Sequence, residues 1–126
     1  MVLSSVLCLA MNIYGEARGE PLEGQIAVAQ VTLNRVAHPD YPDTVCAVVF
    51  QENQFSWTRK QLLIREPKAA MTSFLLAGTI LIAPPEDVTQ GATHFLSGNR
   101  FPDWADQMTQ VATIGNHRFF KDNPSP

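Results

Sequence analysis

Apolar residues recur at a helical spacing in the opening segment of the chain. Ser4 or Ser5 can cap a helix here, because a serine oxygen accepts a hydrogen bond from a free N–H group of the first turn. Gly19 is expected to end this helix, since glycine is favoured just past a helix C-terminus. The apolar stripe of the predicted helix has a four-residue spacing and comprises Leu9, Ile13 and Ala17.

A second helix is predicted from about Pro21 to Ala37. Pro21 suits its first turn, where a missing N–H group costs nothing. His38-Pro39-Asp40 ends it, because the residue before a proline avoids the helical conformation. Its apolar stripe comprises Ile26, Ala29, Leu33 and Val36.

Two more helices and a small sheet are expected after that point. A short helix is predicted around Thr44 to Phe50, and Glu66-Pro67 opens a longer one that reaches about Ala83. The segments from Ala92 to Leu96 and from Val111 to Phe120, the latter interrupted by Gly115, have the pattern of strands. Helices first and strands last indicate an α+β fold.

Length and composition indicate a single globular domain covering residues 1–126. The chain is 45% hydrophobic and 17% charged, which is enough apolar content for one core. Its net charge is −3 and its nine Lys and Arg residues are scattered, so we expect no nucleic-acid partner. The longest apolar run, Phe74 to Ala83, is too short to span a bilayer, so we expect no membrane insertion. We expect a monomer.

Residues 2–11 are largely apolar and could be mistaken for a secretory signal. The first basic residue is Arg18, so the charged start of such a signal is missing. We therefore expect this segment to be the first core helix. On this reading the protein is synthesised in a bacterial cytoplasm without an export signal of its own.

The chain has two cysteines, Cys8 and Cys46, each among apolar residues. We interpret them as two buried reduced thiols, with a bridge between them left open. A metal site built on them is not expected, because neither has a second cysteine or a histidine at ligand spacing.

Glu16 is the main candidate for acid–base chemistry. It lies near the C-terminal end of the first predicted helix, where the helix dipole disfavours a negative charge. Glu20, four residues on, adds a like charge, and both effects raise a carboxyl pKa, as a general acid requires. Arg18 would oppose them if it folded back onto Glu16. The alternative is that Glu16 and Arg18 are ordinary solvated charges at a helix end.

The segment from Gln51 to Trp57 combines amides, a hydroxyl group and two aromatic rings on one predicted loop. Such a set suits carbohydrate, because rings stack on sugar faces and amides bond to hydroxyl and N-acetyl groups. The alternative is that Phe55 and Trp57 fill the core beneath the loop.

Two histidines follow in the strand-forming part of the chain. His94 and His117 could join Glu16 as zinc ligands, but the compact ligand spacing of a zinc motif is missing. We expect His94 to face a cleft or to form a hydrogen bond within the sheet, and we expect no metal and no cofactor.

Taken together, these segments resemble the SleB/CwlJ-type cell-wall hydrolase family, known from spore-cortex-lytic enzymes and bacteriophage lysins. The resemblance extends from about Leu9 to Phe120 and rests on several strings in family order. They are Asn-Ile-Tyr-Gly-Glu-Ala-Arg-Gly-Glu-Pro from Asn12, Gly-Gln-Ile-Ala-Val-Ala-Gln-Val from Gly24, Leu-Asn-Arg-Val from Leu33, Thr-Val-Cys from Thr44, Gln-Phe-Ser-Trp from Gln54, Gly-Ala-Thr-His from Gly91 and Ile-Gly-Asn-His from Ile114.

The resemblance implies a compact fold similar to goose-type lysozyme and lytic transglycosylases, with Glu16 as the catalytic glutamate. The implied substrate is the peptidoglycan glycan strand, cleaved at the β-1,4 bond between N-acetylmuramic acid and N-acetylglucosamine. Glu16 would act first as acid and then as base, giving a 1,6-anhydro product. The expected substrate-binding residues are Tyr14, Glu20, Gln54, Phe55, Ser56, Trp57 and His94.

Two other functions stay open at this point. A hydrolytic muramidase would use Glu20 or Asp103 to position water, and a non-catalytic glycan-binding or phage structural module would not need Glu16 as an acid. Spore enzymes of the family often carry an export signal and a wall-binding module. Because neither is recognised in this sequence, the chain looks more similar to a phage endolysin released through a separate pore, or to a domain excised from a longer protein.

Overall fold

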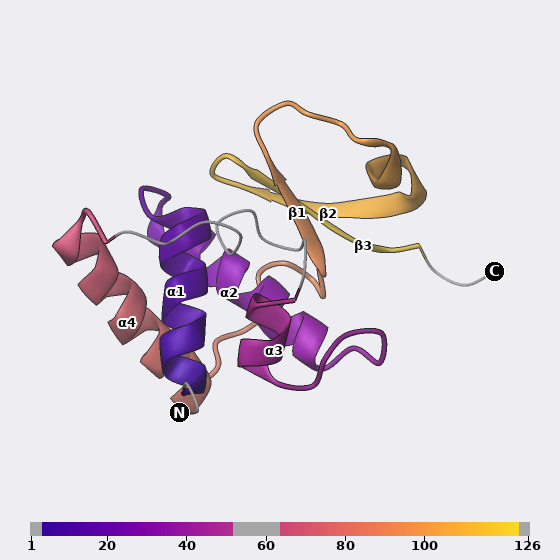
Figure 1. Ribbon diagram of the computed structural model, residues 1–126. Coiled ribbons are helices and arrows are strands. Elements are labelled where there is room, and N and C mark those ends of the chain that lie inside the picture. Colours follow the sequence, from indigo (N-terminus) through magenta and orange to yellow (C-terminus); the bar gives the residue numbers. More distant parts are fainter. Residues whose placement is uncertain (1–3, 52–63, 124–126) are drawn as a thin grey trace.

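The computed structural model describes residues 4–51 and 64–123, which form a group of helices beside a small antiparallel sheet (Figure 1). The α-helices precede the strands along the chain, as predicted. In chain order the described elements are α1 (Ser5–Ala17), α2 (Leu22–Val36), α3 (Val45–Val49), α4 (Pro67–Ile82), β1 (His94–Ser97), the 3-10 helix η2 (Asp103–Gln107), β2 (Met108–Ile114) and β3 (His117–Asp122).

The helix boundaries follow local signals in the sequence. The Ser4 hydroxyl accepts a hydrogen bond from Leu7 N at 3.1 Å, and the Thr44 hydroxyl does the same for Ala47 N. α1 ends before Gly19, whose φ of +92° is a left-handed conformation that favours glycine. Pro21 has an extended conformation, so α2 begins one residue later than predicted.

α1 lies at the centre of the helical part, between α4 and α2 (Figure 1). The largest core cluster joins α1, α2, α3 and α4. Its buried members are Cys8, Leu9, Ala10, Ile13, Ala29, Val45, Val49, Ala77 and Ile80. None of the helices among the described residues is both long and apolar enough to cross a membrane.

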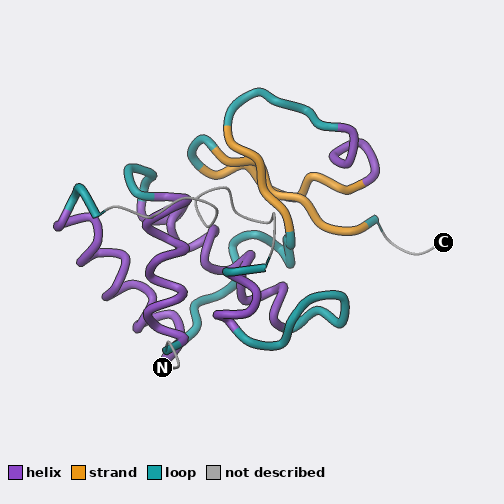
Figure 2. Tube along the Cα trace, viewed as in Figure 1, coloured by secondary structure: helices purple, strands orange, loops and turns teal. Residues whose placement is uncertain are grey.

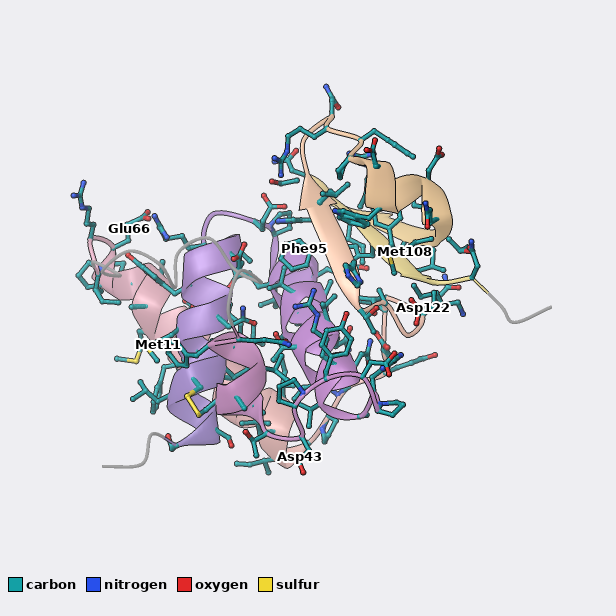
Figure 3. All side chains as sticks on the ribbon, turned by 45° about the vertical axis from the view of Figure 1, so that its right-hand side comes forward. Met11, Asp43, Glu66, Phe95, Met108 and Asp122 are labelled. Carbon is teal, nitrogen blue, oxygen red and sulfur yellow. A yellow bond between two sulfur atoms is a disulfide. The ribbon has the colours of Figure 1, made fainter. Side chains whose placement is uncertain are left out.

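Cys8 and Cys46 form a disulfide, visible as the yellow bond in Figure 3. The interpretation of these residues as reduced thiols was therefore wrong. The cysteines are 38 residues apart in sequence, but their Cα atoms lie 5.2 Å apart because α3 packs against α1. The bridge fastens the short α3 to the central helix.

The sheet has the strand order β1-β3-β2, and both pairings are antiparallel (Figure 2). β1 begins at His94, two residues later than predicted. β2 begins at Met108, three residues earlier than predicted. The hydrophobic pattern does not indicate this start, because Thr109 and Gln110 are polar. β2 is an edge strand, and edge strands often carry polar residues.

The two faces of the sheet bury different clusters. One face packs on α2, and Phe95 points from β1 toward the helices (Figure 3). Its cluster is built on Ala27, Val31, Ala92 and Phe119. On the opposite face Phe120 and Leu96 pack with Ala105 of η2. The sheet is thus held between α2 and η2.

Candidate active site

Glu16 lies in the last turn of α1 and is half-buried. The charge of Glu16 interacts with that of Arg35 of α2, a residue that is only 4% exposed. Burial lowers the pKa of the Arg35 guanidinium, and the charges of Tyr41 and Glu16 act in the opposite direction. Glu16 and Arg35 are therefore electrostatically coupled. Arg35 was not among the predicted site residues, although it belongs to the Leu-Asn-Arg-Val string.

Arg18 does not fold back onto Glu16. Its Nε donates to Glu66 Oε2 at 2.8 Å, and its Nη1 donates to the carbonyl oxygen of Tyr14 at 3.0 Å. The guanidinium also lies 4.6 Å from the centre of the Tyr14 ring. Arg18 is thus directed to the start of α4, and the buried cation whose charge interacts with Glu16 is Arg35.

Tyr14, a predicted substrate-binding residue, is 2% exposed. Its hydroxyl accepts hydrogen bonds from Arg65 N at 3.0 Å and Glu66 N at 3.1 Å. These donors are at the start of α4, where backbone N–H groups have no partner within the helix. The described contacts of Tyr14 therefore connect α1 with α4, and they leave little of its surface for a sugar.

Glu20, the other acidic residue of the first motif, is directed toward the sheet. Its Oε1 accepts hydrogen bonds from Asn116 N at 3.0 Å and from His117 Nδ1 at 3.2 Å, and its Oε2 accepts one from Asn116 Nδ2 at 3.3 Å. The Asn116 backbone bond is the largest influence on the Glu20 pKa, which lies below its ordinary value, and burial only partly offsets it. Glu20 is thus an ionised carboxylate bound to the β2–β3 turn.

His94 lies in a row of rings that starts at the C-terminal end of α2. The row runs from His38 through Tyr41 to His94, and from there to Trp104 of η2, with neighbouring centroids 5.1 to 6.5 Å apart. Burial, reinforced by the positive charge of Arg35, lowers the pKa of His94 to about 4. The ring is therefore neutral near pH 7. Trp104 is 36% exposed and gives this row an accessible aromatic surface.

The zinc hypothesis finds no support in the described ranges. His117 is 4% exposed and bound through Nδ1 to Glu20, while its ring packs against Phe95. His94 is next to the cation of Arg35. Within residues 4–51 and 64–123, no three His, Cys, Asp or Glu side chains gather as metal ligands would.

The predicted sugar-binding residues Gln54, Phe55, Ser56 and Trp57 lie outside the described residues. Their contact with glycan stays a prediction, as does the alternative that Phe55 and Trp57 fill the core. The described row from His38 to Trp104 is a second aromatic surface that the sequence pattern did not reveal, because its members come from three separate segments.

Polar side chains of α2 hold the segment that leads into β1. Gln30 donates to Glu86 O and accepts from Val88 N, and Arg35 Nε donates to Thr93 O at 2.7 Å. Asn34 donates to Asp87 Oδ2 at 3.0 Å and to Ala92 O at 2.9 Å. Gln30, Asn34 and Arg35 of α2 therefore hold the chain segment that leads into β1.

Asp87 organises the same segment and was missed in the sequence. Its carboxylate accepts hydrogen bonds from Thr89 N, from the Thr89 hydroxyl and from Gly91 N. Burial raises the pKa of Asp87, but the bonds from Thr89, Asn34 and Gly91 together bring it below its ordinary value. The string Asp-Val-Thr-Gln-Gly is the signal that could have indicated this turn.

A shallow hollow of about 360 Å³ lies beside this segment. Its walls come from the end of α2, from the entry to β1 and from the end of β3. They are formed by His38, Gly91, Thr93, Lys121 and Asp122. The hollow adjoins the aromatic row through His38 and extends the polar surface at this end of the sheet.

Solved structures with this arrangement of helices and sheet are catalytic domains of SleB proteins. The Bacillus cereus SleB catalytic domain matches with a TM-score of 0.74 and 32% identity, covering 93% of this chain and 89% of that one. The catalytic domain of the germination-specific lytic transglycosylase SleB from Bacillus anthracis matches with a TM-score of 0.76 and 31% identity, over 96% and 97% of the two chains. The predicted α+β, lysozyme-like fold is confirmed.

The chain belongs to the Cell Wall Hydrolase family, which it matches over residues 19–120. It is 32% identical over 117 residues to a spore cortex-lytic enzyme of Halalkalibacterium halodurans, and 31% identical over 116 residues to that of Bacillus subtilis. Each match covers 92% of this chain but only 34% and 37% of the relatives, so the chain spans about a third of their length. Glu16 lies just before the family match begins.

Proposed function

We propose that this domain cleaves the glycan strands of peptidoglycan as a lytic transglycosylase, at the β-1,4 bond between N-acetylmuramic acid and N-acetylglucosamine. The names of the relatives, a spore cortex-lytic enzyme and a lytic transglycosylase, support the substrate class and the reaction. Glu16 is the proposed catalytic residue. The phage-lysin setting and the release through a separate pore stay predictions.

The observation that carries this proposal is the different use of the two glutamates. Glu16 is half-buried and interacts electrostatically with a buried cation, Arg35, whereas both carboxylate oxygens of Glu20 accept hydrogen bonds from Asn116 and His117. A two-carboxylate glycosidase needs a second acidic group free to act as base or nucleophile. The closest acidic neighbour of Glu16 in sequence is committed to the fold, which favours a reaction that uses one protein carboxylate.

In the proposed reaction Glu16 donates its proton to the glycosidic oxygen, and the bond to the muramoyl C1 breaks. The resulting Glu16 carboxylate then takes the proton of the muramoyl 6-hydroxyl group, whose oxygen attacks C1 and closes the 1,6-anhydro ring. Glu16 ends protonated, as it began. Between the two steps it is an anion, and the positive charge of Arg35 stabilises that form.

The glycan is proposed to lie along the side of the molecule where the aromatic row is exposed. Trp104 and His94 offer ring faces for sugar stacking, and His94 is neutral at pH 7, so its ring carries no charge to be desolvated. The predicted contacts of Gln54, Phe55, Ser56 and Trp57 with glycan stay a separate prediction, since these residues lie outside the described ones.

The test is product analysis on purified sacculi with the wild type, Glu16→Gln and Glu23→Gln. Glu23 is an exposed carboxylate of α2 and gives a matched control for the same chemical change. Mass spectrometry should find 1,6-anhydro-muropeptides with the wild type and Glu23→Gln, and a loss of about 10²-fold to 10⁴-fold in rate with Glu16→Gln.

Three results would contradict the proposal in different ways. Reducing muramic acid ends in place of anhydro ends would identify a hydrolytic muramidase, for which Asp103 of η2 is then the acidic residue to test. Glycan cleavage by Glu16→Gln at the wild-type rate would remove Glu16 as the acid. Wall binding without any cleavage by the wild type would indicate a non-catalytic module.

A further inference from the structure

The Glu20 carboxylate joins the turn after α1 to the β2–β3 turn across 96 residues of sequence. Among the described residues, its three hydrogen-bond donors come from Asn116 and His117. The Glu20 side chain is 13% exposed and the His117 side chain 4%, so their hydrogen bond is partly buried, whereas the two bonds from Asn116 are exposed. Because an ionised carboxylate can only accept, Nδ1 is the nitrogen of His117 that carries the proton.

Gly115 shows how closely the two turns approach. A Cβ atom added there would lie 2.6 Å from Glu20 Oε1 and 3.4 Å from Pro21 Cδ, and the residue has a φ of +59°. Any side chain at this position would push the carboxylate away from the turn. The sequence therefore leaves room at residue 115 for the carboxylate of residue 20.

The sheet is attached to the helices by polar contacts at two opposite ends. At one end, α2 holds the entry to β1 through Arg35 and Thr93. At the other end, where Ser97 of β1 pairs with His117 of β3, the turn is held by Glu20. Without Glu20 the sheet would keep its contact at Thr93 and its apolar face on α2, but its other end could shift relative to the end of α1.

We propose that Glu20 is a positioning residue: its carboxylate holds the β2–β3 turn against the C-terminal end of α1 and so fixes where Glu16 stands relative to a glycan bound along the sheet. The proposal rests on the proposed function of Glu16. Glu16 and Glu20 are only four residues apart in sequence. A shift of the turn that carries Glu20 therefore displaces the last turn of α1, where Glu16 lies. Small displacements of a catalytic acid are enough to slow its reaction strongly.

The first test compares Glu20→Gln with Glu23→Gln on soluble glycan strands of defined length. We expect kcat of Glu20→Gln to fall about tenfold or more while KM changes less than threefold, because the acid is displaced and the glycan surface of the sheet is retained. Glu23→Gln should stay within twofold of the wild type. The ratio of wild-type to variant kcat should be the same at several temperatures well below unfolding, since a loss caused by partial unfolding would vanish on cooling.

A spectroscopic measurement reports on the contact itself. In imidazole-detected ¹H–¹⁵N spectra, the His117 Nδ1 proton should give a protected signal in the wild type, Glu16→Gln and Glu23→Gln. The signal should be lost or exchange rapidly in Glu20→Gln. Gly115→Ala, which displaces the carboxylate by its added methyl group, should lose the signal too, and combined with Glu20→Gln it should lower kcat no further than Glu20→Gln alone.

The proposal is overturned if folded Glu20→Gln has the kcat of Glu23→Gln, or if the effects of Glu20→Gln and Gly115→Ala on kcat simply add. Should Glu20→Gln fail to fold, the kcat and His117 signal of Gly115→Ala decide the question alone. These outcomes differ from a failure of the proposed function, in which the wild type does not cleave glycan or Glu16→Gln cleaves as fast as the wild type.

Discussion

Arg35 Nε donates a 2.7 Å hydrogen bond to the carbonyl oxygen of Thr93, at the point where the chain enters β1. The guanidinium also lies 5.2 Å from the centre of the Tyr41 ring, and Arg35 is 4% exposed. One buried side chain thus connects α2, the aromatic row and the first strand, while its charge acts on Glu16. Arg35 therefore contributes both to the fold and to the proposed site.

Replacing Arg35 with methionine should destabilise the protein by about 1–3 kcal/mol, because the buried Thr93 carbonyl loses its donor. Arg35→Lys should also be less stable than the wild type. Lysine lacks the planar guanidinium that binds the Thr93 carbonyl and stacks on the Tyr41 ring at the same time. Urea unfolding measures both variants. Lys68→Met, an exposed change in the first turn of α4, is the control and should stay within about 0.5 kcal/mol. An Arg35→Met midpoint equal to that of the control would contradict the structural role.

The Cys8–Cys46 disulfide should be a major part of the stability of the helical core. It closes a loop of 38 residues, for which chain entropy predicts a contribution of about 4 kcal/mol. We expect a reductant to lower the urea midpoint of the wild type strongly and to leave that of Cys8→Ala/Cys46→Ala unchanged. Thiol titration in denaturant should find no free thiol before reduction and two after it. Two free thiols in the unreduced protein would show that the bridge is not formed.

Tyr14→Phe should weaken the attachment of α4 to α1. The variant keeps the buried ring but removes the acceptor for Arg65 N and Glu66 N. Both donors belong to exposed residues that water can reach. We therefore expect the free energy of unfolding to fall by about 1 kcal/mol, near the lower end of the range for a lost hydrogen-bond partner. Hydrogen exchange of the Glu66 amide should accelerate in Tyr14→Phe while amides of α2 stay unchanged. An unaltered Glu66 amide would show that the hydroxyl is not its acceptor.

The features that could be predicted from the sequence are those fixed by near neighbours. α1 and α3 begin directly after their N-caps, Ser4 and Thr44, and α4 begins at Pro67, so each start depends on a cap or a proline within one turn. The order of helices and strands follows from the change in hydrophobic spacing along the chain. Caps and local hydrophobic spacing act within one segment and do not depend on its tertiary contacts. These elements could therefore be predicted from the sequence alone.

The features that were missed depend on residues brought together from far apart. Arg35 meets Thr93 across 58 residues, and Glu20 meets Asn116 across 96. In the sequence, Arg35 has the appearance of an exposed charge at a helix end, and Glu20 that of a like charge beside Glu16. The pairing of Cys8 with Cys46 likewise depends on the packing of α3 against α1, which no local pattern reports.

His94 should make the stability of the protein depend on pH between about 4 and 6.5. Burial and the charge of Arg35 lower its pKa from an ordinary value of 6.5 to about 4, while Asp122 partly opposes them. In this window the unfolded chain binds a proton at residue 94 that the folded protein excludes, so stability falls as the pH is lowered. The Glu20 carboxylate acts at lower pH, because its pKa lies below 4.5 and its stabilising contribution is lost only as the pH falls through that lower value.

Urea midpoints measured from pH 7 to pH 4 should therefore decline less steeply for His94→Gln than for the wild type. The two proteins should show similar further loss below pH 4. Parallel curves between pH 6.5 and 4 would mean that His94 takes up its proton equally well in the folded protein, and that its ring is not held neutral beside Arg35.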